Sequence, residues 1–347
     1  MIKKILPTMI GAALAGGMTA AAADVAIFGH IDEALLYSDV SPNTATPGFD
    51  GKDTNLVCTT CSIGFKGSED LGNGLSAIFS LDFQYDINNR NQASSGTNSV
   101  LDRDQWVGLA GGFGKVRVGT ISTGYKSHGA MLDPGYRTVA QMRDHGIQSS
   151  LHSGAGEEGQ GRATNTFRWD SPDYSGFKAV VTYTVDSNEG DGEDNNPWGV
   201  GGSYENGGIL VFADYLTNGR GGDDDAWKVG GKYSMNNFAV FAQYESDGGL
   251  ISQSENGFVS NNTINGADVW MVGGSATFGS NTVYAAYGQG DDDNNPSFDS
   301  GYDAWELVGV HSMSKNTLAY AGYVNKNEDD PTGVERQHFT VGMKHKF

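Results

Sequence analysis

Apolar and polar residues alternate along most of the chain, in runs of about ten residues separated by turns rich in glycine and asparagine. The runs 75–85 and 177–185 carry apolar side chains at nearly every second position, and so does the last run, 338–347. A period of two indicates β-strands whose two faces have different surroundings. The pattern therefore predicts an all-β fold.

The connections between the runs come in two lengths that alternate. Seven are short turns, such as 72–74 and 206–208, and eight are longer polar segments, such as 247–265. These connections join sixteen strands, and an even number brings both chain ends to the short-turn side, as in outer-membrane barrels. Aromatic residues of the apolar face flank the short turns, namely Phe177, Tyr204, Tyr233, Phe238, Phe278 and Phe347. Such a girdle is typical of a membrane interface, whereas a soluble sandwich has its aromatic residues in mid-strand. We predict a 16-stranded antiparallel transmembrane β-barrel.

The longest connection, residues 121–163, has no alternating pattern of its own. A loop of this length is usually functional or disordered. It carries apolar residues with which it can pack: Tyr125, Met131, Leu132, Tyr136, Val139, Met142, Ile147 and Leu151. The lumen of the barrel is the natural place for such packing. We therefore expect this third long loop to fold into the lumen and to narrow the channel.

The first 23 residues are typical of a secretory signal peptide. Lys3 and Lys4 precede an apolar stretch, 5–15, and small residues at 21–23 provide the cleavage site. Nothing later in the sequence approaches the ~20 apolar residues of a membrane-spanning helix. We expect residues 24–347 to form a single barrel domain in an exported protein.

The net charge of −20 argues against a nucleic-acid partner, because no basic stripe is available to neutralise phosphates. The acidic residues cluster in the long connections, where solvated loop tips are the simplest interpretation. A calcium loop at 291–295 is rejected because Pro296 stands where a glycine turn is needed. For Cys58 and Cys61 a local disulfide is favoured over two free thiols, and a zinc site would need two more ligands. No metal or other cofactor is expected.

Strand parity places Lys66, Arg117 and Arg168 on the inner wall near mid-height. Acidic partners are available on the long loop and on the wall, namely Asp133, Asp144, Asp32 and Asp82. A basic wall opposite an acidic loop would create an electric field across the narrow part of the channel. The alternative is that these are wall residues that form salt bridges with the loop. Three bases against four acids are close to balance, and the acidic outer loops then predict a weak cation preference at low salt.

A catalytic site finds little support. Asp144, His145 and Ser149 occur close together, but no nucleophile elbow accompanies them. The glycines at 112 and 114 lack the third glycine of a dinucleotide fingerprint and read as a turn. We do not expect an enzyme.

Four segments together resemble the trimeric general porins of Gram-negative bacteria: 62–75, 108–119, 165–172 and the C-terminal 341–347. The resemblance covers the whole chain after the signal peptide. It implies a homotrimer in the outer membrane, in contact with its lipid and lipopolysaccharide, with the third loop in the channel and Phe347 as an assembly signal. Asp32 departs from the pattern, because a lysine is expected at this position.

The resemblance implies passive diffusion of small hydrophilic solutes and ions. Two alternatives stay open. A substrate-specific channel would need a ladder of inward aromatic residues, and parity offers only Trp106, Phe212, Phe241 and Tyr323. A structural or adhesin barrel would have a plugged lumen.

Overall fold

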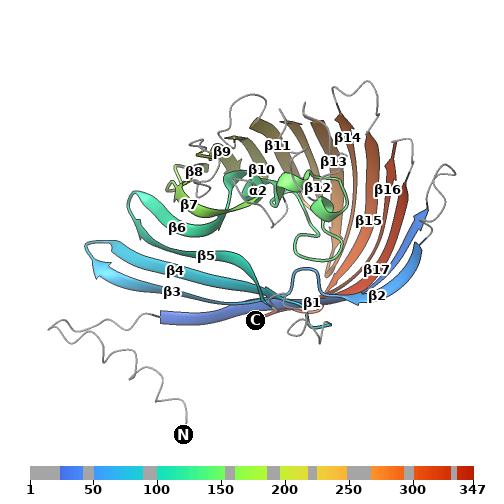
Figure 1. Ribbon diagram of the computed structural model, residues 1–347, viewed down its shortest axis with the longest axis horizontal. Coiled ribbons are helices and arrows are strands. Elements are labelled where there is room, and N and C mark those ends of the chain that lie inside the picture. Colours follow the sequence, from blue (N-terminus) through green and yellow to red (C-terminus); the bar gives the residue numbers. More distant parts are fainter. Residues whose placement is uncertain are drawn as a thin grey trace, which may run out of the picture.

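A computed structural model describes residues 24–41, 51–88, 100–152, 161–185, 196–217, 225–247, 267–292, 301–329 and 334–347 (Figure 1). The predicted signal peptide lies outside the described residues, and so does part of the acidic sequence in the long connections. Among the described helices, none is both long and apolar enough to span a membrane.

All strands belong to one antiparallel sheet that closes on itself, because β1 pairs with β17. The segments are β1 (Asp24–Ser41), β2 (Gly51–Val57), β3 (Ser62–Gly72), β4 (Leu75–Tyr85), β5 (Val100–Gly111), β6 (Gly114–Ser122), β7 (Arg162–Asp170), β8 (Phe177–Thr184), β9 (Trp198–Asn206), β10 (Ile209–Thr217), β11 (Asp225–Met235), β12 (Phe238–Asp247), β13 (Ala267–Phe278), β14 (Asn281–Asp292), β15 (Tyr302–Ser312), β16 (Thr317–Glu328) and β17 (Glu335–Lys346). Because β2 and β3 pair with adjacent stretches of β1, they form one interrupted strand, and the predicted 16-stranded barrel is confirmed.

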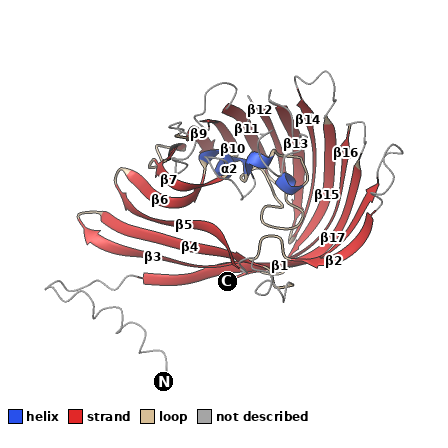
Figure 2. Cartoon of the chain, in the orientation of Figure 1, coloured by secondary structure: helices blue, strands red, loops and turns tan. Residues whose placement is uncertain are grey.

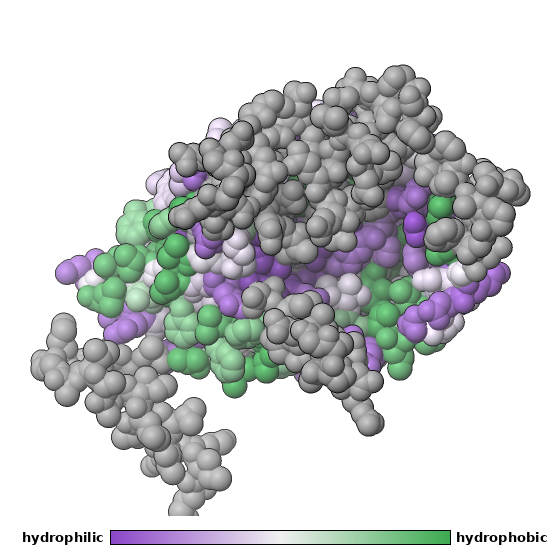
Figure 3. Space-filling model, viewed as in Figure 1, coloured by the Kyte–Doolittle hydropathy of each residue, from purple (hydrophilic) through white to green (hydrophobic). Residues whose placement is uncertain are grey.

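The two faces of the sheet differ as the alternation requires. Outward positions carry exposed apolar side chains such as Val107, which is 57% exposed, and inward positions carry buried or polar ones such as Asp214 and Lys228. Figure 3 shows hydrophobic residues around the outer edge of the barrel and hydrophilic residues in its hollow. A wall with this distribution is stable where lipid covers the outer face and water fills the inside.

Aromatic side chains form belts near both ends of the strands. The ring of Phe177 packs against that of Tyr204 in a tilted arrangement, and Phe238 lies edge-to-face with Phe278, beside the short turns as predicted. At the opposite ends, four consecutive hairpins each carry a tryptophan–tyrosine contact: Trp198–Tyr215, Trp227–Tyr244, Trp270–Tyr287 and Trp305–Tyr323. This second belt marks the other membrane interface. Sequence reasoning identified only the first.

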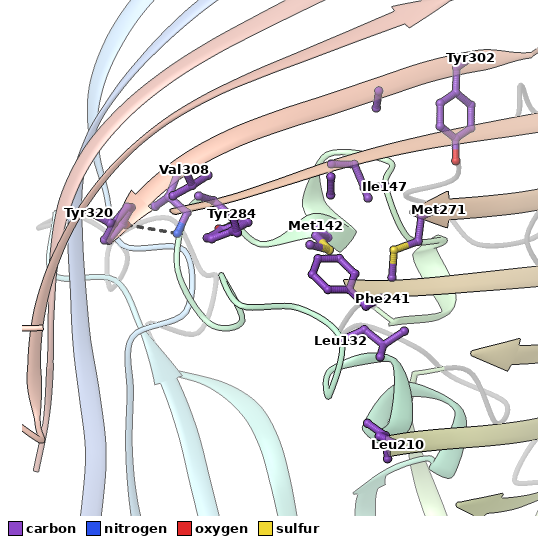
Figure 4. Close-up of a cluster of buried hydrophobic side chains, with 14 of the residues drawn as sticks. Leu132, Met142, Ile147, Leu210, Phe241, Met271, Tyr284, Tyr302, Val308 and Tyr320 are labelled. Carbon is purple, nitrogen blue, oxygen red and sulfur yellow. Dashed lines mark hydrogen bonds between the residues drawn. The ribbon is translucent and has the colours of Figure 1, made fainter. Parts of the chain in front are cut away.

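The long loop runs from β6 to β7 and contains α2 (Gly124–Gly129) and the short 3₁₀ turns η3 (Met142–Asp144) and η4 (Ser150–His152). Thr123 caps α2, because its hydroxyl accepts a hydrogen bond from the Lys126 amide at 3.3 Å. The helical turns lie on the concave side of the sheet (Figure 2). Apolar loop residues, including Leu132, Met142 and Ile147, join one buried cluster with side chains of the wall (Figure 4).

Candidate channel constriction

One part of the loop is attached to β10, β11 and β12, and we call this attachment the first anchor. The hydroxyls of Tyr125 and Ser149 both donate to the Glu245 carboxylate, at 2.8 and 2.6 Å. His128 Nδ1 lies 2.7 Å from Asp214 Oδ1. Each contact joins a loop side chain to an inward side chain of the wall, so α2 and η4 are held against the same three strands.

Lys228 lies at the centre of the first anchor, with none of its side chain exposed. Its ammonium donates to the backbone carbonyl of Tyr125. It also donates to His152 Nε2, and the two nitrogens lie 2.9 Å apart. Its Nζ also lies 3.7 Å from Asp214 Oδ2 and 4.1 Å from the centre of the Tyr125 ring. A buried ammonium is tolerated only where such partners replace water. Because an ammonium can only donate, His152 Nε2 accepts, and its Nδ1–H donates to the Ser149 carbonyl at 3.1 Å.

The second anchor attaches residues 136–140 to the strands near the barrel seam. The Tyr284 hydroxyl donates to the Ala140 carbonyl at 3.1 Å. The Val139 amide donates to the Tyr320 oxygen at 3.3 Å, a contact drawn in Figure 4. The Tyr320 hydroxyl in turn donates to Asp32 at 3.2 Å. The loop therefore contacts the wall in two separate sectors.

Lys344 completes the second anchor. Its Nζ donates to the backbone carbonyls of Tyr136 and Arg137, at 3.1 and 2.6 Å. Lys232 makes a similar bond to the Met131 carbonyl at 2.9 Å. These wall lysines therefore hold loop backbone, and only part of their charge is available to a passing ion.

Arg117 and Arg168 face each other on β6 and β7 and share one acid, Asp170. Arg168 also donates to the Ser127 hydroxyl of α2 at 3.0 Å. The Arg117 guanidinium lies 5.0 Å from the centre of the Trp106 ring. Both predicted arginines therefore lie on the inner wall beside the loop. Sequence reasoning did not identify Asp170 as their partner.

A β-bulge places two further charges on the inner wall. The register of β4 with β5 shifts by one residue after Leu81, so that Arg103 and Asp104 lie opposite Asp82. Arg103 Nε lies 3.2 Å from Asp82, and Arg162 Nε lies 2.6 Å from Asp104. Strict alternation along β5 assigns Arg103 to the outer face. The sequence pattern therefore did not identify it as a residue of the inner wall.

The predicted acids are mostly hidden from the channel. Asp32 and Asp82 are almost fully buried, Asp82 beside Arg103. Asp133 is buried inside the loop, where its carboxylate accepts hydrogen bonds from the amides of Gly135 and Met142, at 2.8 and 3.1 Å. The expectation that these three acids face the eyelet is wrong, because each is used by a neighbouring backbone or side chain. Asp144 remains partly exposed.

Lys66 is exposed on the inward face of β3 and lies 5.2 Å from the centre of the Phe28 ring. Cys58 and Cys61 form a disulfide between β2 and β3. Phe347 pairs with Gly29 through two backbone hydrogen bonds, each of 3.1 Å, at the seam of the barrel. The expected inward aromatic Tyr323 instead lies on the outer face against Trp305.

Burial shapes the titration of three loop residues. It lowers the pKa of the Lys126 ammonium well below its ordinary value, and Arg162 and Arg143 lower it further. The Lys126 Nζ has no hydrogen-bond partner among the described residues. Burial raises the pKa of the Asp133 carboxyl to about 7 and lowers the pKa of His152 to about 4. In each case burial shifts the protonation equilibrium of the group towards its neutral form.

Within the described ranges, no group of three or more histidine, cysteine, aspartate or glutamate residues is arranged to hold a metal ion.

The comparisons with known proteins agree with this architecture. The family model of the Gram-negative porins matches residues 8–331. The major outer membrane protein P.IB of Neisseria meningitidis serogroup B is 32% identical over 206 residues, which are 59% of this chain and 56% of that protein. The P.IB protein of Neisseria lactamica is 32% identical over 218 residues, 60% of this chain and 57% of that protein. The matches span a little over half the length of these curated relatives.

Two solved structures share the fold along nearly the whole chain. An anion-selective porin from Comamonas acidovorans has a TM-score of 0.71 at 22% identity, over 94% of this chain and all of that one. OmpF of Salmonella typhi, in complex with daunomycin, has a TM-score of 0.69 at 17% identity, over 93% of this chain and 97% of that one. With the family model matching most of its length, the chain belongs to the Gram-negative porin family, and its barrel is that of an outer-membrane protein.

Proposed function

We propose that the protein is a channel for passive diffusion of small hydrophilic solutes and ions across the outer membrane. The observation that carries the proposal is a closed barrel with an apolar outer face, a polar inner face and a long loop held against the inner wall at two anchors. A loop fixed in this way narrows the water-filled space and sets a size limit. Inward aromatic side chains such as Tyr284 and Tyr320 bond to the loop, so they do not form a free ladder for one substrate.

Liposome swelling with sugars of graded size separates this proposal from its alternatives. We expect uptake rates that fall smoothly with solute size and do not saturate with concentration. Saturable uptake of one sugar would instead support a substrate-specific channel. Absence of swelling would support a structural or adhesin barrel.

Beside the loop, the inner wall keeps basic side chains whose predicted acidic counterparts Asp32, Asp82 and Asp133 are buried. Lys66 and Lys115 are exposed, and neither has an ion pair in the part of the chain that the structure describes. Among the described residues, Arg117 and Arg168 form ion pairs with one shared acid, Asp170. The sequence-based expectation of a weak cation preference counted Asp32, Asp82 and Asp133 against the wall bases, and these three acids are buried. We therefore infer that anions are preferred in the narrow part of the channel.

The ion preference is tested by the reversal potential across a planar bilayer under a potassium chloride gradient. At high mean salt the outer acidic loops are screened, because the Debye length falls to ~3 Å at 1 M. We expect an anion preference that persists there, and that Arg117→Ser and Arg168→Ser each reduce. Lys52→Ser is the matched control, because this exposed lysine pairs with Asp39 on the outer parity of β2 and β1. A cation preference of the unchanged protein at high salt would refute the inference.

We also infer a homotrimer whose remaining outer surface is surrounded by lipid and lipopolysaccharide. The outer face from β3 to β6 differs from the rest of the described wall, because its exposed large residues are aliphatic or phenyl: Ile63, Phe65, Leu71, Leu81, Val107, Leu109, Phe113, Val116 and Val118. The tryptophan–tyrosine belt runs instead along β9 to β16. Tryptophan and tyrosine favour the lipid interface, so a sector that lacks the belt supports contact with other copies.

A further inference from the structure

Residues 58–61 interrupt the second barrel strand between β2 and β3, and we call them the disulfide bulge. On either side of the bulge, Val57 pairs with Ala34 and Ser62 pairs with His30. The four residues 58–61 therefore lie opposite the three residues 31–33 of β1. The Cys58–Cys61 bond closes the bulge, and the Cα atoms of the two cysteines lie 5.7 Å apart. Such an insertion re-aims a side chain that regular pairing would place elsewhere. Thr60 lies within this insertion, and its side chain is almost fully buried.

The Thr60 hydroxyl is aimed at the long loop by a chain of hydrogen bonds. It donates to the Arg137 carbonyl at 2.9 Å. A carbonyl can only accept, so the hydroxyl proton points at the loop, and His30 Nε2–H must donate to the Thr60 oxygen at 3.2 Å. His30 Nδ1 is then the acceptor for the Ser62 hydroxyl at 3.3 Å. The chain runs in one direction, from the wall to the loop.

Arg137 is a residue whose backbone needs such support. Its φ of 62° lies in the left-handed region, which is unfavourable for residues other than glycine and persists only where the surroundings fix it. Its carbonyl accepts from Thr60 and from Lys344, at 2.9 and 2.6 Å. Its amide donates to the Gln141 side chain at 3.1 Å. The turn at 135–138 is thus held from two strands of the wall.

We propose that Thr60, presented by the disulfide bulge, is a positioning residue that keeps the turn at 135–138 against the wall and so keeps the channel at one width. The proposal rests on the proposed function. Without the hydroxyl, Lys344 would be the remaining partner of the Arg137 carbonyl among the described residues. Loss of one net hydrogen bond corresponds to an about fivefold increase in the population of the released turn.

Single-channel recordings in planar bilayers test the proposal with three substitutions. Thr60→Val keeps the branched shape and removes the hydroxyl, and Thr60→Ser restores the hydroxyl. Thr59→Val is the matched control, because Thr59 is an exposed neighbour in the same bulge. We expect Thr60→Val to spend about five times as long in secondary conductance levels as the unchanged protein, whereas Thr60→Ser and Thr59→Val do not differ from it.

A second arm tests the bulge itself. Cys58→Ala combined with Cys61→Ala leaves Thr60 in place but frees its backbone, and should also lengthen the time in secondary levels. This double variant replaces Thr60→Val if the latter yields no folded barrel, as judged by heat-dependent mobility on a gel. Current traces equal to those of Thr59→Val would overturn the proposal. An unchanged protein that conducts no ions at all would instead refute the proposed function.

Discussion

At the scale of single residues, the seam of the barrel depends on a close contact between Gly29 and Phe347. Two backbone hydrogen bonds join them, and a Cβ atom at position 29 would lie 2.8 Å from the phenyl ring. The aromatic ring therefore lies over a glycine, where no other residue leaves room for it. This contact closes the ladder between the first and last strands, and an open ladder would expose unpaired backbone groups to lipid.

We expect Phe347→Ala to lower the yield of folded barrel far more than it changes the channel. The substitution removes the ring over Gly29 but alters no inward charge. The measurements are the amount of folded protein on a native gel and the conductance of the protein that does fold. Met343→Ala is a suitable control, since Met343 is exposed on the same face of β17. Equal folded yields for the two variants would contradict the expectation.

His152 gives the first anchor a pH dependence. Its pKa of about 4 in the docked loop lies below the ordinary value of 6.5, so docking favours the neutral imidazole. For a base with a lowered pKa, the stabilisation is complete above pH 6.5 and is lost as the pH falls towards 4. Asp133 has the opposite sign, because its raised pKa makes docking less favourable as the pH rises towards 7.

The contribution of His152 is isolated by comparison with His152→Gln, which keeps an acceptor for Lys228 and does not titrate. Both proteins retain Asp133, so its contribution cancels. We expect the unchanged protein to show a growing fraction of secondary conductance levels between pH 6.5 and 4 relative to the variant. Identical pH profiles would show that loop docking does not depend on this histidine.

At the scale of elements, apolar burial and polar anchors divide the work of holding the loop. Leu132, Met142 and Ile147 are almost fully buried in the cluster shared with the wall. Full burial of such a side chain contributes roughly 1.5–3 kcal/mol, compared with ~1 kcal/mol net for a hydrogen bond. The apolar contacts therefore supply most of the attachment, and the two anchors fix its orientation.

Deletion of residues 129–151 should widen the channel without unfolding the barrel. The pairing of β6 with β7 and of every other strand pair is untouched by the deletion, and loops on a paired scaffold tolerate such changes. The measurements are single-channel conductance and the size limit in liposome swelling, and both should increase. A conductance that fell or stayed the same in a normally folded barrel would mean that the loop is not the constriction.

At the scale of the whole molecule, the aliphatic outer sector from β3 to β6 is the surface where we expect other copies to bind. Phe65→Arg places a charge in this sector, on an exposed side chain that points away from the channel. We expect it to convert trimer to folded monomer, measured by the mass of the detergent-solubilised protein. Val283→Arg, on the outer face of β14, is the control and should leave the trimer intact. Loss of trimer in both variants would remove the case for this sector.

The alternation of apolar and polar residues by itself determined the barrel. A period of two is a local property, so the residues of each strand can be assigned to the inner or outer face without knowledge of the other strands. The alternation of short and long connections then predicted sixteen strands, and the even number placed both chain ends at the short-turn end of the barrel. For the same reason the inward positions of Arg117 and Arg168 could be read directly from parity.

Only the tertiary structure decided which charges face the channel. The bulge in β5 reverses the inward–outward alternation at Arg103, and no local sequence pattern predicts this bulge. The Asp133 carboxylate is used by amides of its own loop, a result of the way the loop folds. The bond from Tyr125 to Glu245 joins residues 120 positions apart. Contacts of this kind follow from how the loop packs against the wall. A periodic pattern of apolar and polar residues does not predict them.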